Sequence, residues 1–385
     1  MHVCFVALKA YAVLTGEDIG GQIGGAEVQQ ALIARSLVKR GHRITFLTYD
    51  YGQPDGLCID GIEIRKTYAL RAGFPLVRFL HPRWATLTRV MRQLDADVYY
   101  QRGAGLETGQ VAWFCRRHHK PFVFATGSDT DCRADLPRLE GWREKALYRF
   151  GLHRAHRVVV QSERQTQLMR EEFGVEGQLI RSCGPTLVEP REARQAKEGP
   201  WRILWVGRLV PVKRPDLMVE MARCRPDWYF EVVGEANVPS GFSRRIAQDA
   251  GQLPNVKLHG PVPYPALGRF YDQADVLLCT SRHEGFPNTL LEAWTRGLPV
   301  VSTVDPDGVI SRWGLGAAAA SSQALTDAVD RLLREGDRYR ETSGRCLDYV
   351  RQHHSSERVG DAYEALFTGL GMRHAPRDER IAVSP

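Results

Sequence analysis

The feature that most constrains the fold is an alternation of short apolar runs with longer amphipathic stretches along the first half of the chain. Short apolar runs are typical of buried strands, and apolar residues at every third or fourth position are typical of helices. Strands alternating with helices predict a parallel, doubly wound α/β sheet. We expect its strands at His2–Leu8, Arg43–Tyr49, Ile62–Tyr68, Asp97–Gln101, Pro121–Thr126, Arg157–Gln161 and Gln178–Ile180. We expect its helices at Ala26–Arg40, Leu76–Leu94, Glu107–His118, Gly141–His153 and Glu163–Glu172.

The same alternation restarts after a polar stretch. Cys183 to Pro200 is rich in Pro, Glu and Arg, which predicts a linker. We therefore predict two Rossmann-like domains, 1–190 and 191–350, facing each other across a cleft, then a last helix in 351–370 that crosses back onto the first domain, and a frayed tail, 371–385. The patterns of the second half lie at Arg202–Val206, Asp216–Ala222, Trp228–Val233, Phe242–Ala250, Val256–His259, Tyr264–Phe270 and Asp275–Thr280.

Length and composition agree with two soluble domains. The chain has 385 residues, which is long for one core, with 43% hydrophobic and 25% charged residues. No apolar run reaches the roughly 20 residues that span a bilayer, and we read Met1–Leu8 as a first strand rather than a signal peptide. The eight cysteines include no Cys-x-x-Cys pair, which predicts mostly buried thiols in a reducing compartment and hence a cytoplasmic protein.

Positive charge is concentrated in the first half, where 26 Lys and Arg stand against 20 Asp and Glu through Pro190. An anionic partner such as a phospholipid surface would fit this excess, and so would ordinary solubility. Arg71–Leu94 mixes basic with aromatic and aliphatic residues, which suits an interfacial helix at the inner membrane face or, the interpretation we favour, a core-facing helix. Trp142–Arg157 leaves the same alternatives open. No nucleic-acid-binding module accompanies the charge, so we expect no nucleic-acid partner.

Two carboxylates flank a predicted helix start in the second half. Glu284 lies on a loop at the carboxyl end of the strand Asp275–Thr280, where open α/β sheets bind ligands. Glu292 lies about one turn into the following helix, where it is well placed to accept hydrogen bonds from a sugar diol. Asn288 is predicted as the N-cap of this helix, whose free N–H groups would favour an anion. A site that binds a phosphate at the helix start and has a carboxylate on each side suits a nucleotide-sugar.

Two cations follow the first predicted strand of the second domain. Arg208 and Lys213 lie five residues apart, ahead of a helix that starts near Pro215. Cleavage of a nucleotide-sugar leaves extra negative charge on the diphosphate, which cations already in place can stabilise. The Arg208 guanidinium would form a bidentate contact with phosphate oxygens, and Lys213 would act as a point charge.

These segments resemble the retaining family 4 glycosyltransferases, which have the GT-B fold. Glu284 and Glu292, with seven residues between them, look like the paired-glutamate motif of that family. The resemblance runs nearly end to end, and the intervening residues make the match more specific. Those residues are Gly285, Phe286, Pro287 and Asn288.

The resemblance implies roles for individual residues. Arg208 and Lys213 would stabilise the diphosphate, Glu284 would orient the transferred sugar with the loop Gly285–Asn288, and Glu292 would hold the ribose. Gly25 is the second glycine of a Gly-Gly-x-Glu loop, whose backbone amides would approach the donor. Gly234 follows a strand and would lie beside the nucleotide. The catalytic residues would be Glu284, Arg208 and Lys213; the donor-binding residues would be Gly25, Asp129, Gly234, Gly285, Phe286, Pro287, Asn288 and Glu292.

One segment departs from the family pattern. Many relatives have His-Gly-x-Asp at the end of a first-domain strand, with the histidine reaching the donor sugar. Here the match is Thr126-Gly127-Ser128-Asp129. A hydroxyl can still donate a hydrogen bond, but it cannot carry charge, and Asp129 remains a predicted site residue.

The resemblance implies a retaining, metal-independent hexosyltransferase without a cofactor. A nucleotide-sugar would be the donor, and a glycan or lipid-linked molecule the acceptor, in polysaccharide or glycolipid synthesis. Three alternatives stay open: a metal enzyme using the Asp-x-Asp of Asp129 and Asp131, a sugar-nucleotide epimerase-like enzyme, and a non-catalytic glycan- or nucleotide-binding protein on the same fold. The pair His353–His354 is predicted as an exposed helix end. We expect the base pocket near Gly260–Tyr264.

Overall fold

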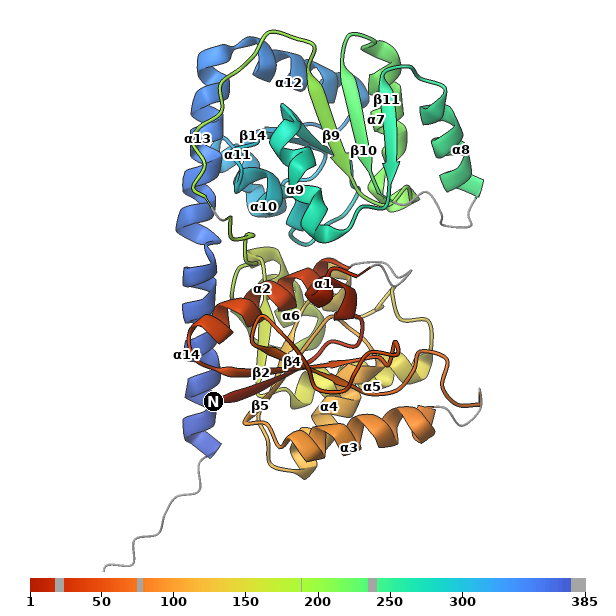
Figure 1. The fold of residues 1–385 in the computed structure, drawn as a ribbon, viewed down its shortest axis with the longest axis vertical. Coiled ribbons are helices and arrows are strands. Elements are labelled where there is room, and N and C mark those ends of the chain that lie inside the picture. The colour runs from red at the N-terminus through yellow and green to blue at the C-terminus, as the bar shows by residue number, and fades with distance from the viewer. Residues whose placement is uncertain (18–23, 75–78, 188, 235–240, 375–385) are drawn as a thin grey trace, which may run out of the picture.

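The computed structural model describes residues 1–17, 24–74, 79–187, 189–234 and 241–374, which form two α/β domains stacked end to end (Figure 1). Within these residues the first domain has an eight-stranded sheet of order β3-β4-β2-β1-β5-β6-β7-β8. Neighbouring strands are parallel except β3 and β4. The strands are β1 His2–Val6, β2 Arg43–Thr48, β3 Leu57–Ile59, β4 Ile62–Lys66, β5 Val98–Arg102, β6 Phe122–Ala125, β7 Arg157–Val160 and β8 Gly177–Leu179.

Helices cover both faces of this sheet. Val3 and Phe5 of β1 point into one apolar cluster, and Cys4 and Val6 point into the other. A parallel sheet that is buried on both faces requires nearly continuous apolar strands, which explains the sequence pattern. The helices are α1 Tyr11–Thr15, α2 Gly25–Lys39, α3 Ala85–Leu94, α4 Leu106–Arg117, α5 Trp142–Arg154 and α6 Glu163–Phe173.

The second domain repeats this architecture with a parallel sheet that has six strands within the described residues, in the order β11-β10-β9-β12-β13-β14. The predicted fold class of two doubly wound parallel sheets is therefore confirmed. The strands are β9 Arg202–Val206, β10 Tyr229–Val233, β11 Val256–Gly260, β12 Val276–Cys279, β13 Val300–Ser302 and β14 Gly316–Ala318. The helices are α7 Pro215–Cys224, α8 Gly241–Gly251, α9 Tyr264–Gln273, α10 Asn288–Trp294, α11 Val309–Trp313, α12 Ser322–Arg334, α13 Gly336–His353 and α14 Ser356–His374.

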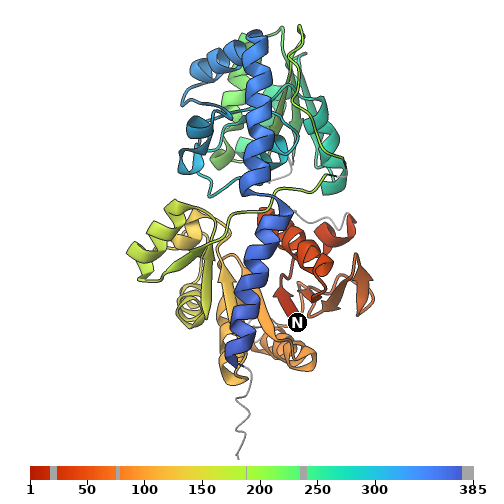
Figure 2. The same cartoon turned by 90° about the vertical axis from the view of Figure 1, so that its left-hand side faces the viewer.

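The last two helices form a column along both domains (Figure 2). α13 packs on the second domain, and α14 packs on α2 of the first, where apolar residues such as Tyr363 and Phe367 join the core. Arg40 adds ion pairs to Asp361 at 2.5 Å and to Glu364 at 3.3 Å. The chain therefore crosses between the domains twice, once between Cys183 of the first core and Arg191, which pairs with Asp272 of the second domain, and once after His353.

The predicted helix Leu76–Leu94 is interrupted at His81. Residues 75–78 lie outside the described part, Phe79–Trp84 is a distorted turn in which His81 is not helical, and α3 starts only at Ala85. Pro82 accounts for the break because its ring removes an N–H and clashes with the preceding turn. The short elements α1, β3 and β14 were not predicted, because they span only three to five residues each.

α3 itself is a core-facing helix, since Leu87, Val90 and Met91 are buried. The exposed apolar side chains of this region, Phe74 and Leu80, precede it and are 81% and 65% exposed. Within the described residues, no helix is long and apolar enough to cross a membrane. Six of the eight cysteines are buried, which confirms the prediction of mostly buried thiols.

Candidate active site between the domains

The carboxyl ends of β9 and β12 bring Lys213 and Glu284 together. Their side chains form a short ion pair and are 27% and 18% exposed. Thr280 holds this arrangement in place, because its hydroxyl donates to the Lys213 carbonyl at 2.7 Å and accepts from the Trp205 indole at 2.8 Å. The lysine and the carboxylate, 71 residues apart in the chain, thus have fixed positions at one sheet edge.

Arg208 follows β9 with an exposed side chain, two residues beyond the end of the strand. The neighbouring turn is anchored by Ser243, whose hydroxyl donates to the Leu209 carbonyl at 2.6 Å. Arg208 and Lys213 therefore both leave the loop that follows the central strand of this domain.

Gly234 ends β10 in a backbone conformation that only glycine adopts readily, with φ +148°. A Cβ there would lie 1.8 Å from the Gly207 carbonyl oxygen. The absence of a side chain at Gly234 thus allows two strand ends to pack closely. The sequence had instead suggested that this glycine lets a ligand approach the backbone. The following residues, 235–240, lie outside the described part.

The loop Gly285–Asn288 reaches the first domain. A Cβ on Gly285 would lie 2.7 Å from Nε2 of Gln165 and 3.3 Å from Oδ1 of Asp129. Asp129 itself accepts from Gln165 at 3.0 Å and lies 3.4 Å from the Arg164 guanidinium. Burial raises the pKa of Asp129, while Gln165 and Arg164 oppose that shift.

Asn288 does not cap α10, and the N-cap prediction is wrong. Pro287 occupies the N-cap position, and Asn288 is the first helical residue. Its side chain instead joins the domains: Nδ2 donates to the Gly25 carbonyl at 2.9 Å, and Oδ1 accepts from Gln29 at 3.1 Å. Gly25 starts α2, while residues 18–23 of its loop lie outside the described part.

Phe286 packs on the second crossing of the chain. Its ring lies 5.1 Å from the ring of His354, which is fully buried. His354 contacts the Ser182 carbonyl through Nδ1 at 2.7 Å, and burial lowers its pKa to about 3. The prediction of an exposed helix end is therefore wrong for His354, which is a buried, neutral side chain at the second crossing of the chain.

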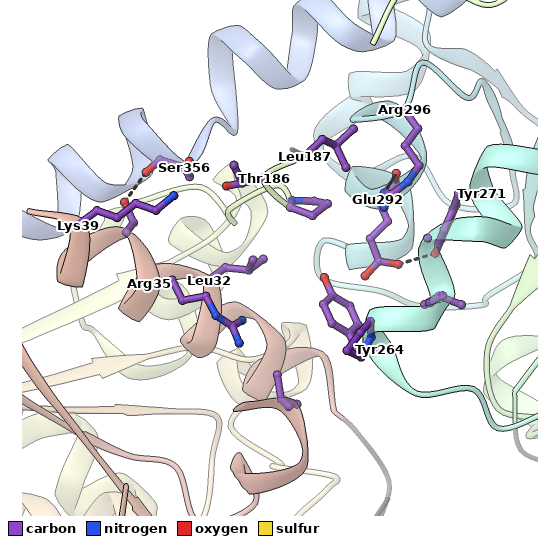
Figure 3. Close-up of a pocket in the computed structure, with 16 residues that line it drawn as sticks. Leu32, Arg35, Lys39, Thr186, Leu187, Tyr264, Tyr271, Glu292, Arg296 and Ser356 are labelled. Atoms are coloured by element: carbon purple, nitrogen blue, oxygen red, sulfur yellow. Dashed lines mark hydrogen bonds between the residues drawn. The ribbon is translucent and has the colours of Figure 1, made fainter. Parts of the chain in front are cut away.

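Glu292 faces a cavity of about 330 Å³ that both domains line (Figure 3). Its carboxylate accepts from the Tyr271 hydroxyl at 2.5 Å, and burial raises its pKa to about 7 despite Tyr271, Arg296 and Tyr264. The lining residues are Val13, Leu32, Arg35, Ser36, Lys39, Pro185, Thr186, Leu187, Tyr264, Pro265, Leu267, Gly268, Tyr271, Glu292, Arg296 and Ser356. A cavity with one carboxylate and several cations and hydroxyls would hold a polar ligand rich in hydrogen-bond acceptors.

Asp131 uses its carboxylate within its own loop. Oδ2 accepts from the backbone N–H groups of Gly127 and Ser128, at 2.7 and 3.2 Å. Among the residues that the structure describes, no group of three or more His, Cys, Asp or Glu is arranged to hold a metal ion. The geometry therefore fits a turn-forming role for Asp131, and Asp129 alone of the pair lies against the Glu284 loop.

Sequence reasoning missed Gln29, Gln165, His354 and Tyr271. Each is a buried polar residue within a helix or at its end, and its partners come from distant segments. The only signal was polarity at a buried helix position, which a single sequence does not reveal. Tyr264, at the edge of the segment predicted for the base pocket, does line the cavity.

The fold and the paired charges define a two-domain α/β protein with a polar cavity between its domains. The model of the family "Glycosyltransferase Family 4" matches residues 23–182, and the model of "Glycosyl transferases group 1" matches residues 189–349. Together the two matches cover well over half of the chain, which therefore belongs to the GT-B glycosyltransferases of the group 1 and family 4 type.

Individual proteins agree with this assignment. The chain is 32% identical to the D-inositol 3-phosphate glycosyltransferase of Frankia alni over 34% of its own length and 37% of the relative's. It is 28% identical to the lipopolysaccharide core biosynthesis mannosyltransferase of Rhizobium meliloti, over 40% and 46% of the two chains. The matches thus span less than half of the length of these curated relatives. The structure of Anabaena HepE in complex with UDP-glucose superposes with a TM-score of 0.71 at 15% identity, covering 96% of this chain and all of that one, which shows the shared fold.

Proposed function

We propose that the protein is a retaining, metal-independent hexosyltransferase acting in polysaccharide or glycolipid synthesis. It would move a sugar from a nucleoside diphosphate donor to a glycan or lipid-linked acceptor. The observation that carries the proposal is the ion pair of Lys213 and Glu284 at the carboxyl edge of the second sheet, where the next residue, Gly285, packs against Asp129 of the first domain. The family assignment and the names of the relatives support the same class of reaction.

The second domain would hold the donor. Arg208 and Lys213 would stabilise the negative charge that develops on the diphosphate as the sugar leaves. Glu292 would accept hydrogen bonds from the ribose in the cavity beside Tyr264, since a carboxylate matches a diol. Glu284 and the loop Gly285–Asn288 would orient the sugar.

Retention without an enzymic nucleophile implies attack from the face that the diphosphate leaves. The bond between the anomeric carbon and the diphosphate oxygen breaks, and the acceptor oxygen bonds to the same face of that carbon. The acceptor proton passes to the departing phosphate, so no protein base is required. The cations Arg208 and Lys213 would replace the divalent metal that other glycosyltransferases use, and the backbone contacts of Asp131 support this interpretation.

The first test is thermal-shift measurement with UDP, GDP, ADP and their sugars, each with and without chelator. A ligand that binds only the folded protein raises its apparent stability in proportion to the logarithm of saturation. We expect one nucleotide to raise the unfolding temperature even in the presence of chelator. When acceptor glycans are added to the matching nucleotide-sugar, we expect that nucleotide to be released. A shift that requires metal would replace the cation assignment with the Asp-x-Asp alternative. Binding without nucleotide release would favour a non-catalytic protein.

We also propose that the first domain contacts a lipid surface through the exposed Phe74 and Leu80, together with the exposed basic Arg71, three residues before Phe74. Cosedimentation with anionic vesicles should fall when both apolar residues are changed to Ser. Equal cosedimentation of the variant would remove this surface from the proposal.

A further inference from the structure

A buried hydrogen-bond network links the end of β6 to the start of α6. Gln165 lies at its centre and is fully buried. Its Oε1 accepts from the Thr126 hydroxyl at 2.7 Å and from the Gln161 backbone N–H at 3.0 Å. Because a backbone N–H can only donate, the oxygen of this amide must face Gln161. The amide nitrogen therefore has a fixed direction, toward Asp129.

Gln165 and Asp129 meet at the first-domain side of the interface. Nε2 of Gln165 donates to Oδ1 of Asp129 at 3.0 Å. Gly285 covers both groups, and any side chain there would collide with Nε2. Since Gly285 follows Glu284 directly, this network lies against the start of the proposed sugar-orienting loop, whose last residue, Asn288, contacts Gly25 and Gln29.

Thr126 does not reach the interface itself. Its hydroxyl is fully buried and is used by Gln165, with the Val159 carbonyl at 3.4 Å as a second neighbour. This hydroxyl is therefore already used within the first domain, and Thr126 does not offer the sugar contact that the histidine of many relatives makes. Gln165 thus links the Thr126 hydroxyl, on one side, to the carboxylate of Asp129 on the other.

We propose that Asp129 binds a hydroxyl of the transferred sugar and that Gln165 is the positioning residue that aims its carboxylate. A carboxylate is an acceptor, so it would select a sugar with a free hydroxyl donor at that position. This inference rests on the proposed function and adds Gln165 to Asp129, which the family resemblance already implies as a donor-binding residue. In it, Gln165 acts on the ligand indirectly, because Gln165 contacts Asp129 and not the sugar itself.

The matched comparison is a nucleoside diphosphate against the same nucleotide bearing its sugar. The probes are UDP with UDP-glucose and GDP with GDP-mannose, measured by calorimetry on the full chain. Asp129→Asn keeps the acceptor for Gln165 and should stay folded. Gln165→Met removes the donor at nearly constant volume. Gln167→Met, on the exposed face of the same helix, is the control.

We expect both interface variants to bind the nucleoside diphosphate as the parent does and to lose about 10- to 100-fold in affinity for the nucleotide-sugar, as for one hydrogen bond to a charged group. Thr126→Ser should keep the parent affinities and Thr126→Val should lose part of them, which a merely structural role would not reproduce. Gln167→Met should match the parent.

Two results would overturn the inference. If Asp129→Asn, the variant expected to remain folded, binds the nucleotide-sugar as tightly as the parent does, Asp129 does not bind the sugar. If both variants lose nucleoside diphosphate and nucleotide-sugar equally, the network serves the fold. Failure of the parent chain to bind any nucleotide would instead defeat the proposed function, and the inference with it.

Discussion

Lys213 and Glu284 are oppositely charged partners that a bound donor would separate. In the free protein the glutamate holds the ammonium at the sheet edge, so that the cation is already in place when a diphosphate arrives. Organised charge of this kind costs no rearrangement during the reaction. The pair is partly exposed, so its contribution to folding is small.

Lys213→Ala should therefore reduce turnover far more than stability. Removing one such charge costs about 10²- to 10³-fold in rate, while loss of a partly exposed ion pair costs roughly 1 kcal/mol or less of folding free energy. Turnover of the donor identified by thermal shift, together with urea unfolding, measures both quantities. Lys197→Ala, which removes the exposed partner of Asp275, is the control. Near-normal turnover in Lys213→Ala would exclude the diphosphate role.

Glu292 gives a prediction about pH. Its pKa is about 7 in the folded protein against an ordinary value of 4.5, because burial disfavours the charged carboxylate. Between these values the folded chain holds a proton that the unfolded chain has lost, so raising the pH lowers the free energy of unfolding, by about 3 kcal/mol at most. Glu292→Gln should remove this loss and be more stable than the parent at pH 8, while binding nucleotide less tightly.

Urea unfolding of the parent and of Glu292→Gln at pH 5 and pH 8 tests this expectation. The exposed Glu220→Gln on α7 should leave the pH dependence unchanged. Parallel pH profiles for the parent and Glu292→Gln would mean that the buried carboxylate does not titrate in this window.

The residues predicted from the sequence are those that carry local signals. Glu284 was found because glycine and proline break a strand beside it, and Lys213 because it follows a buried strand. Gln165 and His354 were not found, since their importance arises from partners more than 30 and 60 residues away. Polarity alone does not distinguish a buried network from a solvated surface.

At the scale of elements, the two glycines that follow β9 and β10 set how closely the loops after these strands approach each other. Gly234 touches the Gly207 backbone, which cannot move aside as a flexible side chain can. The spacing of these two strand ends therefore determines where Arg208 leaves the sheet.

Gly234→Ala should displace the loop and destabilise the second domain. The new Cβ would overlap the Gly207 carbonyl, and the positive φ adds strain of about 1–3 kcal/mol. We expect a lower midpoint of thermal unfolding and weaker nucleotide binding. Gly251→Ala at the end of α8 meets nothing within 4 Å and is the control. An unchanged midpoint in Gly234→Ala would show that the loop adapts without strain.

Long elements were predictable, and several of the short ones were not. The helix from Gly25 to Lys39 and the strands of both cores follow clear periodicities, because one side of a helix or both sides of a strand are buried. The distorted turn before α3 and the seven-residue α10 depend on packing. In α10 the interaction of Asn288 with the first domain replaced the cap that local propensity favours.

At the scale of the whole molecule, the domains are joined by more than the two crossings of the chain. Asp307 of the second domain accepts from the backbone N–H groups of Glu163 and Arg164, at 2.9 and 3.2 Å, and so caps α6 of the first. Gln29 of the first domain and Asn288 of the second add a second bridge, at 3.1 Å. Together these contacts favour the arrangement in which Asp129 faces the Glu284 loop, and their loss should favour a more open one.

Asp307→Ala should therefore shift the balance between closed and open arrangements without unfolding either domain. Loss of a helix cap costs about 1 kcal/mol, which corresponds to a roughly fivefold change in population. Small-angle scattering should give a larger radius of gyration for the variant, and saturating nucleotide-sugar should reduce the difference if the ligand binds both domains. Asp305→Ala is the matched control, because Asp305 caps α11 within the second domain, at Ile310 and Ser311. It should lower the stability of that domain and leave the radius unchanged. Identical radii for the parent and Asp307→Ala would mean that the remaining bridges hold the domains together, and that α6 capping contributes nothing to closure.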